Sequence, residues 1–486
     1  MQTFTRIFIA FYVFIMCGVY FQSFGQIIEK APSSPVAVDT ISLGSKEQVS
    51  VQINDIFLSG YKRTKPYIIL REVPFKKGEI LTVNELNTKL RLCKQQLIYT
   101  TLFVDVEVTP IKVDSAHVFI YIHVKERWYL FPIPYFKIVS RNFNTWWYEQ
   151  NHSLQRVEYG LKFQQNNATG RNDNLNLWFI NGYTQQMSLR YDNPNMGKNL
   201  QHGFNIGFGY RRNRELNYDM DSILSNKWGF YKEEDRFLIT QGYLDFTYTY
   251  RPAIRTRHSI KAGYGSYSVD SSVVKLNPDY FGKSITKIRY FDIGYNISYA
   301  NLDYSPYPMK GFAGEVHIEN RFGKNSNYLQ LTARSNNCFK LGRQSSFQLQ
   351  SVGIIRTPVN QSYVNNSLMG SADVYMRGLE YYVVQGVAGG IARGTIRNEL
   401  LSFNILNPFK SKSHDKIPFR LFIKAYGDLG YSYLPNPGIS VLNNKLLRTW
   451  GLGVDIITFY DVVIRFEYTY NQLGERDLFF HNQTDW

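Results

Sequence analysis

Few residues in this 486-residue chain are placed to carry out covalent chemistry. The eight histidines are scattered, and His117 and His123, which share a predicted strand, are six residues apart, too far to share a metal ion. The sequence contains no Gly-x-Ser-x-Gly nucleophile motif, no phosphate-binding loop and no dinucleotide fingerprint. The sequence therefore predicts no catalytic residues, no metal and no cofactor, and it argues against an enzyme.

Composition favours a mainly β protein. Aromatic residues make up 16% of the chain and charged residues 19%, whereas a disordered chain would be poor in aromatics and richer in charge. A mean hydropathy of −0.30 argues against a polytopic helical membrane protein. Three cysteines exclude a disulfide scaffold, and we expect Cys93 and Cys338 to be unpaired thiols.

The first 25 residues have the pattern of a secretory signal peptide. Arg6 precedes a short apolar run, and small residues stand at positions −3 and −1 of a cut before Gln26. The alternative is an N-terminal membrane anchor, although the run is shorter than the ~20 residues of a spanning helix. Residues 26–48 are predicted to be a flexible lead-in.

Residues 49–126 read as a small α+β domain with the order strand, helix, helix, strand, strand. Thr82 and Glu85 form a predicted capping box, in which each side chain binds the backbone amide of the other residue. An apolar helical stripe follows at Leu86, Leu90, Cys93 and Leu97.

This domain resembles the polypeptide-transport-associated (POTRA) domain. The residues that carry the resemblance are Ser59-Gly60-Tyr61, Arg71-Glu72, Phe103-Val104-Asp105-Val106 and Val124-Lys125-Glu126. The resemblance implies a periplasmic domain that binds extended chains by adding strands to its sheet edge. A generic small α+β module is the alternative.

Residues 132–486 read as an antiparallel transmembrane β-barrel. Apolar and polar residues alternate in segments such as Gly203–Tyr210, Tyr243–Tyr250, Phe291–Tyr299 and Val462–Tyr470. A soluble sandwich would also alternate, but the segments are many, the apolar faces are aromatic, and the other faces are polar or glycine, as a wet lumen allows. Sixteen candidate strands can be counted, an even number as bacterial barrels have.

One long segment, residues 357–388, contains a motif that indicates which family of barrels the chain resembles. It contains Tyr375-Met376-Arg377-Gly378-Leu379, and the motifs Gly389-Gly390, Asn398-Glu399-Leu400 and Tyr426-Gly427-Asp428-Leu429-Gly430 follow in that order. This arrangement resembles the BamA/TamA outer-membrane assembly and translocation superfamily, the surface antigen family, here with a single POTRA domain.

The resemblance implies a loop that folds into the lumen and is anchored there. Arg377 and Gly378 would form the loop motif, Asp428 and Gly430 the wall site, and Glu399 a third member of the anchor. Asp428 lies an even number of residues from Arg420 and Lys424, so the three side chains share one face of the strand, which agrees with a luminal position for Asp428. An arginine suits such an anchor because its planar fork of donors matches a carboxylate.

The C-terminus also fits the resemblance. A last strand is predicted from about Asp477 to Trp486, with Phe479 and His481 on one face. In the family a terminal aromatic strand is read by assembly machinery, so Phe479, His481 and Trp486 are the expected signal residues.

These features lead to three hypotheses. The first is assembly or translocation of unfolded outer-membrane or secreted polypeptides, in the outer membrane of a Gram-negative bacterium, with the POTRA-like domain in the periplasm. Its partners would include lipids, lipopolysaccharide and periplasmic accessory proteins; the net charge of +16 suits lipopolysaccharide phosphates, a basic lumen or a solvated surface, not nucleic acid. The others are a passive pore or transporter and a surface scaffold.

Overall fold

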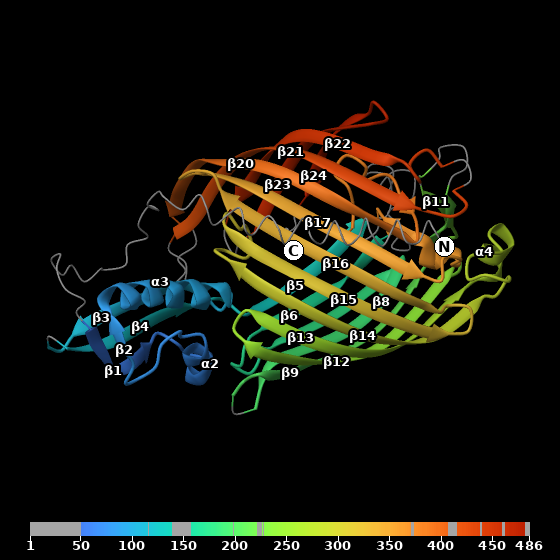
Figure 1. Ribbon diagram of the computed structural model, residues 1–486. Coiled ribbons are helices and arrows are strands. Elements are labelled where there is room, and N and C mark those ends of the chain that lie inside the picture. The colour runs from blue at the N-terminus through green and yellow to red at the C-terminus, as the bar shows by residue number, and fades with distance from the viewer. Residues whose placement is uncertain are drawn as a thin grey trace.

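The computed structural model describes residues 50–114, 116–138, 157–197, 199–220, 226, 228–370, 374–406, 416–437, 440–458 and 462–481. The predicted signal peptide (1–25), the lead-in (26–48) and Trp486 lie outside these residues. The described chain forms a small α+β domain beside a sixteen-stranded antiparallel sheet that curls into a barrel (Figure 1). None of the helices it contains is long and apolar enough to cross a bilayer.

The N-terminal domain has the predicted strand and helix order, with one further short strand. Its elements are β1 (Ser50–Ser59), α2 (Pro66–Arg71), β2 (Ile80–Thr82), α3 (Val83–Tyr99), β3 (Phe103–Lys112) and β4 (His117–Glu126). They form a sheet of order β2-β1-β4-β3. The extra strand, β2, has three residues, too few for an alternating pattern to reveal it.

The predicted capping box and helical stripe are both confirmed. Glu85 N donates to Thr82 Oγ1 at 3.3 Å, and Thr82 N donates to the Glu85 carboxylate at 2.9 Å. This arrangement satisfies two amides that would otherwise lack partners at the start of α3. Leu86, Leu90, Cys93 and Leu97 are fully buried against the sheet, and burial raises the pKa of the Cys93 thiol to about 12.

The barrel contains the sixteen predicted strands. They are β5 (Leu130–Ile138), β6 (Val157–Asn166), β7 (Asn174–Gly182), β8 (Thr184–Met196), β9 (His202–Asn213), β12 (Ile239–Ala253), β13 (Thr256–Val269), β14 (Lys287–Leu302), β15 (Gly311–Gly323), β16 (Tyr328–Lys340), β17 (Ser345–Thr357), β20 (Ala388–Leu406), β21 (Lys416–Tyr433), β22 (Leu446–Ile457), β23 (Val463–Asn471) and β24 (Arg476–His481). Each strand pairs with its neighbour in chain order.

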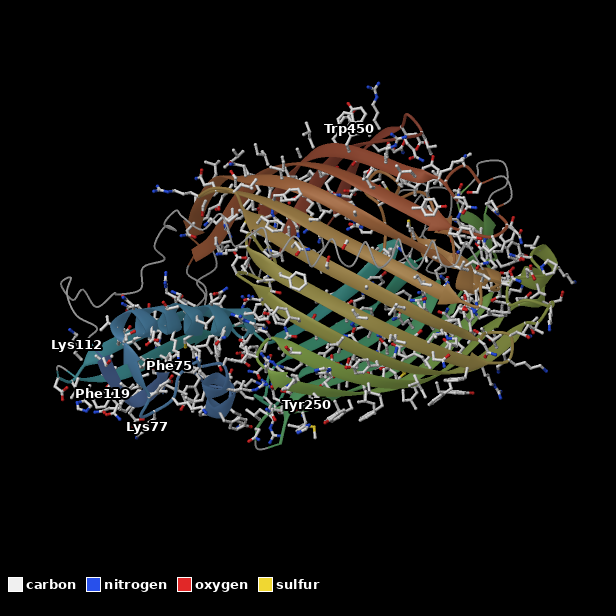
Figure 2. The ribbon with its side chains drawn as sticks, in the orientation of Figure 1. Phe75, Lys77, Lys112, Phe119, Tyr250 and Trp450 are labelled. Carbon is white, nitrogen blue, oxygen red and sulfur yellow. The ribbon has the colours of Figure 1, made fainter. Side chains whose placement is uncertain are left out.

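The two faces of the sheet differ as the alternation predicts. On β12, Leu244 and Phe246 point outward and are about half exposed, whereas Asp245 between them is buried and binds Arg190 of β8. On β14, Asp292 is likewise buried and forms a bidentate pair with Arg321 of β15. The outer face, from which Tyr250 and Trp450 project (Figure 2), therefore suits hydrocarbon, and charged residues pair on the inner wall.

The connections at the two ends of the barrel differ in length. Smaller elements lie at the end away from the POTRA-like domain: β10 (Glu215–Met220), β11 (Trp228–Lys232), α4 (Ser271–Leu276), α5 (Tyr363–Asn366), β18 (Ser367–Met369) and β19 (Val384–Gln385) (Figure 1). The POTRA-like domain lies at the opposite end, where most turns are short.

Polar contacts join the POTRA-like domain to the turns of the barrel. Glu72 accepts two hydrogen bonds from Arg251, at 2.8 and 3.2 Å, and Arg71 donates to Asn195 at 2.9 Å. The backbone amide of Lys65 donates to the carbonyl of Gly170 at 2.9 Å. The domain is therefore docked on the barrel by an ion pair and by backbone pairing.

The first and last strands, β5 and β24, form the two ends of the sheet order. Within residues 130–138 and 476–481, which the structure describes, no ladder joins these two strands. We refer to this boundary as the seam.

Candidate functional site

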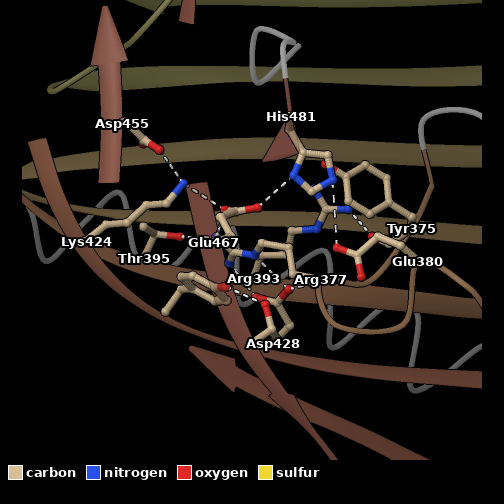
Figure 3. A network of polar contacts seen from close by, with 12 residues as sticks. Tyr375, Arg377, Glu380, Arg393, Thr395, Lys424, Asp428, Asp455, Glu467 and His481 are labelled. Carbon is tan, nitrogen blue, oxygen red and sulfur yellow. Dashed lines mark hydrogen bonds and ion pairs between the residues drawn. The ribbon is translucent and has the colours of Figure 1, made fainter. Parts of the chain in front are cut away.

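Arg377 lies inside the barrel and binds Asp428 of β21. We call residues 374–383, between β18 and β19, the luminal loop. Arg377 Nε and Nη2 donate to the two Asp428 oxygens at 2.9 and 2.5 Å, and the Arg377 backbone amide donates to Oδ2 at 3.3 Å (Figure 3). The structure thus brings together the arginine and the aspartate that the sequence motifs single out.

Further contacts surround the guanidinium. Its Nη1 donates to Thr395 of β20 at 3.1 Å, and its carbon lies 4.0 Å from the centre of the Tyr426 ring. Arg377 is 6% exposed and Asp428 is 1% exposed. A buried ion pair is tolerated when hydrogen bonds satisfy the remaining donors and acceptors, and here the donors of the fork are directed at partners on the wall.

Both motif glycines leave room that a side chain would fill. Gly378 has φ +82°, and a Cβ atom there would come within 2.3 Å of Thr469 Cγ2. A Cβ on Gly430 would lie 3.0 Å from the Met376 sulfur. The loop can therefore approach the wall closely because both contact points lack side chains.

Apolar side chains of the luminal loop also pack against the wall. Met376, Leu379 and Tyr382 are buried in one cluster with Leu447 and Ile391. This burial stabilises the loop inside the barrel in addition to the polar anchor.

Glu399 does not join the anchor. It forms a bidentate pair with Arg420 at 2.9 Å for both bonds. Along β20, Arg393 is the residue that pairs in register with Asp428, and Glu399 lies six residues further on, about 20 Å away at ~3.3 Å per residue. The expectation of Glu399 as a third member was therefore wrong, because the residue lies too far down the strand.

Three wall residues that the sequence motifs did not identify extend the site. Glu467 of β23 lies 3.8 Å from Arg377 and 2.7 Å from Lys424 of β21. Lys424 also pairs with Asp455 of β22 at 2.5 Å. The alternation along each strand already placed these residues on the inner face, but alternation alone does not show which charged side chains meet there.

The luminal loop also contacts the last strand, β24, through three aromatic or charged pairs. Tyr375 stacks on His481 with ring centres 5.6 Å apart, and Tyr381 packs on Phe479 at 5.4 Å. Glu380 lies 3.8 Å from His481 Nε2 (Figure 3). Phe479 and His481, predicted as C-terminal signal residues, thus face the loop from inside the barrel.

His481 and the turn before β24 complete this contact. His481 Nδ1 lies 3.0 Å from Glu467, and Tyr382 donates to Glu475 at 2.6 Å. The Asn471 amide donates to the Gly378 carbonyl at 2.9 Å. One loop therefore binds both the Asp428 site and the strand at the seam.

Glu380 is a buried carboxylate of the luminal loop, outside the strands. No side chain among the described residues donates a hydrogen bond to either of its oxygens. Burial raises the pKa of Glu380 to about 7, and nearby Glu467 adds to the effect, while the backbone amides of Glu380 and Gly378 and the His481 side chain oppose it.

The charged groups on the described part of the inner wall form a connected network of ion pairs. Within the described residues, no group of three or more His, Cys, Asp or Glu side chains is arranged to hold a metal ion. The arrangement can hold the loop against the wall and tie it to the seam.

Family models match both parts of the chain. The model for the surface antigen variable number repeat, a POTRA domain, matches residues 51–127, and the model for the Omp85 superfamily domain matches residues 167–378. No curated protein sequence matches the chain significantly.

Among solved structures, similar folds include a BamA and two CdiB proteins. BamA from Haemophilus ducreyi, solved without POTRA domains 1–3, has 14% identity and a TM-score of 0.46, over 89% of this chain and 84% of that chain. CdiB from Escherichia coli has 10% identity and a TM-score of 0.49, over 88% and 75%. CdiB from Acinetobacter baumannii has 11% identity and a TM-score of 0.47, over 88% and 72%.

The two family models agree with the resemblance that the sequence motifs suggested, and with the POTRA-like domain and sixteen-stranded barrel of the structure. The chain carries a POTRA domain followed by an Omp85 superfamily domain.

Proposed function

We propose that this protein assembles polypeptides into the outer membrane or translocates them across it. Omp85 superfamily barrels lie in the outer membrane of Gram-negative bacteria. The POTRA domain would lie in the periplasm and receive unfolded chains there, by strand addition at the edge of its sheet. Neither step requires a nucleotide, a metal or a cofactor.

The observation that carries the proposal is the double attachment of the luminal loop. The loop binds Asp428 on the wall and, through Glu380 and Tyr375, the last strand at His481. A loop that only blocked a pore would need the wall contact alone. Its attachment to the seam supports a role in controlling where a client strand would pair.

Unpaired strand edges are costly in lipid, which gives the seam a physical role. Backbone groups without partners cost several kcal/mol each in hydrocarbon. A barrel whose end strands separate would offer an incoming strand the partners that lipid cannot provide. The anchored loop would keep those end strands in place until a client arrives.

Client assembly into liposomes tests the proposal. A radiolabelled eight-stranded outer-membrane barrel, diluted from urea, would be added to liposomes that contain the purified protein. Liposomes with an unrelated sixteen-stranded porin are the matched control. We expect faster formation of protease-resistant client than in the control.

The alternative hypotheses predict a different result. A passive pore would give ion conductance with client assembly no faster than in the porin control, and a scaffold would give neither. Either result would overturn the proposed function.

A further inference from the structure

The turn between β14 and β15 enters the barrel from the POTRA end. In residues 303–310, Tyr307 is fully buried, and Pro308 and Met309 are buried beside it. Tyr307 donates to Asp455 of β22 at 2.8 Å. Since β14 and β15 are separated from β22 by several strands in the sheet, this contact crosses the lumen.

The wall holds the turn by aromatic and cationic contacts. The Tyr307 ring lies 4.6 Å from the Phe422 ring of β21, centre to centre. Arg397 of β20 donates to the Pro308 carbonyl, and its guanidinium carbon lies 4.2 Å from the centre of the Tyr307 ring. The turn therefore packs against specific side chains of the inner wall and is not a loose surface connection.

An unbroken series of polar contacts links this turn to the luminal loop. Asp455, which binds Tyr307, pairs with Lys424; Lys424 pairs with Glu467 at 2.7 Å. Glu467 then meets Arg377 at 3.8 Å and His481 at 3.0 Å (Figure 3).

These contacts cover a substantial length of the inner wall. Phe422 lies opposite Asp455 in the ladder and is six residues from Asp428 along β21, about 20 Å at ~3.3 Å per residue. The series therefore connects an element at the POTRA end with both the loop and the seam.

The POTRA domain contacts the start of the same turn. Gln95 of α3 donates to the Leu302 carbonyl at 3.1 Å. Tyr99 of α3 and Ser305 of the turn line a cavity of about 170 Å³ between the two domains. A displacement of α3 would therefore act directly on the turn.

We propose that residues 303–310 form a second luminal plug that couples the position of the POTRA domain to the luminal loop through Tyr307 and Asp455. While Tyr307 holds Asp455, the Lys424 and Glu467 pairs keep the Arg377 loop and the last strand in place. Withdrawal of the turn loosens both. The inference rests on the proposed function for its biological meaning. The coupling between the turn and the luminal loop can, however, be measured without a client polypeptide.

Thiol labelling reports on the luminal loop. Met376 is 2% exposed and lies next to Arg377, so a Met376→Cys variant becomes reactive toward a charged maleimide only when the loop leaves the wall. The native Cys93 and Cys338 are buried, and the unmodified chain gives the background rate. Retarded gel mobility on heating verifies that each variant contains a folded barrel.

Tyr307→Phe is the central variant, because it removes one hydroxyl and keeps the ring. In the reporter background we expect about a tenfold faster labelling rate, as for loss of one hydrogen bond to a charged group. Tyr264→Phe is the matched control, since it removes an outward-facing hydroxyl from the adjacent strand, β13, away from the turn; we expect a rate within twofold of the reporter alone. Equal rates for Tyr307→Phe and Tyr264→Phe would overturn the proposal.

A second variant tests the same path independently, and a client assay then distinguishes failure of the coupling from failure of the proposed function. Asp455→Asn weakens the pair with Lys424, and we expect it to raise labelling as Tyr307→Phe does, with no further rise when both are combined. Multiplicative effects of the two would contradict a shared path. If labelling behaves as expected but the protein does not assemble clients, the proposed function fails and the coupling stands.

Discussion

Glu380 of the luminal loop faces His481 of the last strand across 3.8 Å, and both are largely buried inside the barrel. The luminal loop carries the Arg377-Gly378 motif, and this contact joins that loop to the last strand at the seam (Figure 3). Its strength depends on the protonation of the Glu380 carboxylate, to which no side chain among the described residues donates a hydrogen bond.

The raised pKa of Glu380 predicts that stability falls with rising pH. The folded-state pKa of about 7 lies above the ordinary value of 4.5. The stabilisation by the bound proton is therefore complete below pH 4.5, declines as pH rises above 4.5, and is lost once pH passes 7. Glu380→Gln mimics the protonated form. We expect the variant to be more stable than the native chain at pH 8.5, by on the order of 2 kcal/mol.

Thermal unfolding of both proteins in detergent measures this effect. The Tm difference between Glu380→Gln and the native chain should be small at pH 4, grow between pH 4.5 and 7, and stay constant above about pH 7.5. A difference that is constant with pH would show that Glu380 does not titrate in this range.

Arg377→Lys tests whether the fork geometry matters beyond charge. Lysine keeps the charge but cannot form the two parallel bonds to Asp428. We expect loop docking to weaken by about 2 kcal/mol, seen as faster proteinase K cleavage between Gly370 and Val387. Arg420→Lys, which disturbs the wall pair with Glu399 on the same strand as Asp428, is the control and should leave this cleavage rate near the native value.

Gly378→Ala should loosen the loop by about 3 kcal/mol, from backbone strain at φ +82° and from the clash with Thr469 Cγ2. Thr469→Ser removes that methyl group and keeps the hydroxyl that meets Tyr426 at 2.6 Å. The same cleavage assay should therefore show partial rescue in the double variant. Full rescue would mean that the backbone conformation costs little, and no rescue would mean that the clash is relieved by other movements.

Glu72→Gln should undock the POTRA domain from the barrel. Glu72 is the carboxylate that Arg251 binds with two donors, and Arg71 lies beside it with a pKa lowered to about 10 by burial and by nearby Arg251. Loss of the carboxylate leaves these guanidinium groups to repel each other.

Hydrogen exchange of the Lys65 amide, which donates to the Gly170 carbonyl of the barrel, reports this undocking. We expect exchange at least tenfold faster in Glu72→Gln. Glu79→Gln, which breaks the Lys89 pair within the POTRA domain, is the control. Unchanged Lys65 exchange in Glu72→Gln would show that backbone pairing alone holds the junction.

The architecture could be predicted from the sequence because each barrel strand repeats the same physical requirement. Alternation of outward apolar with inward polar residues, as at Leu244, Asp245 and Phe246, recurs in most strands, and the capping box of Thr82 and Glu85 marks the start of α3. The short strand β2 was missed because three residues are too few to show the alternating pattern of a strand.

The contacts of the site were less predictable. The motifs identified Arg377 and Asp428, but Glu399 was wrongly assigned, since register and distance along β20 decide its partner. The buried turn at Tyr307 was missed because it has no periodic pattern and its partners lie far along the chain, on β20, β21 and β22. Such contacts across a lumen depend on barrel closure, which local sequence does not encode.

The most direct test of the account compares client assembly and ion conductance in the same liposomes, for the native chain, Arg377→Ala and Arg420→Ala. The account predicts that Arg377→Ala conducts more and assembles the client barrel at least tenfold more slowly than the native chain, while Arg420→Ala resembles the native chain in both. Increased conductance with no loss of assembly in Arg377→Ala would contradict a role of the anchored loop in handling polypeptides.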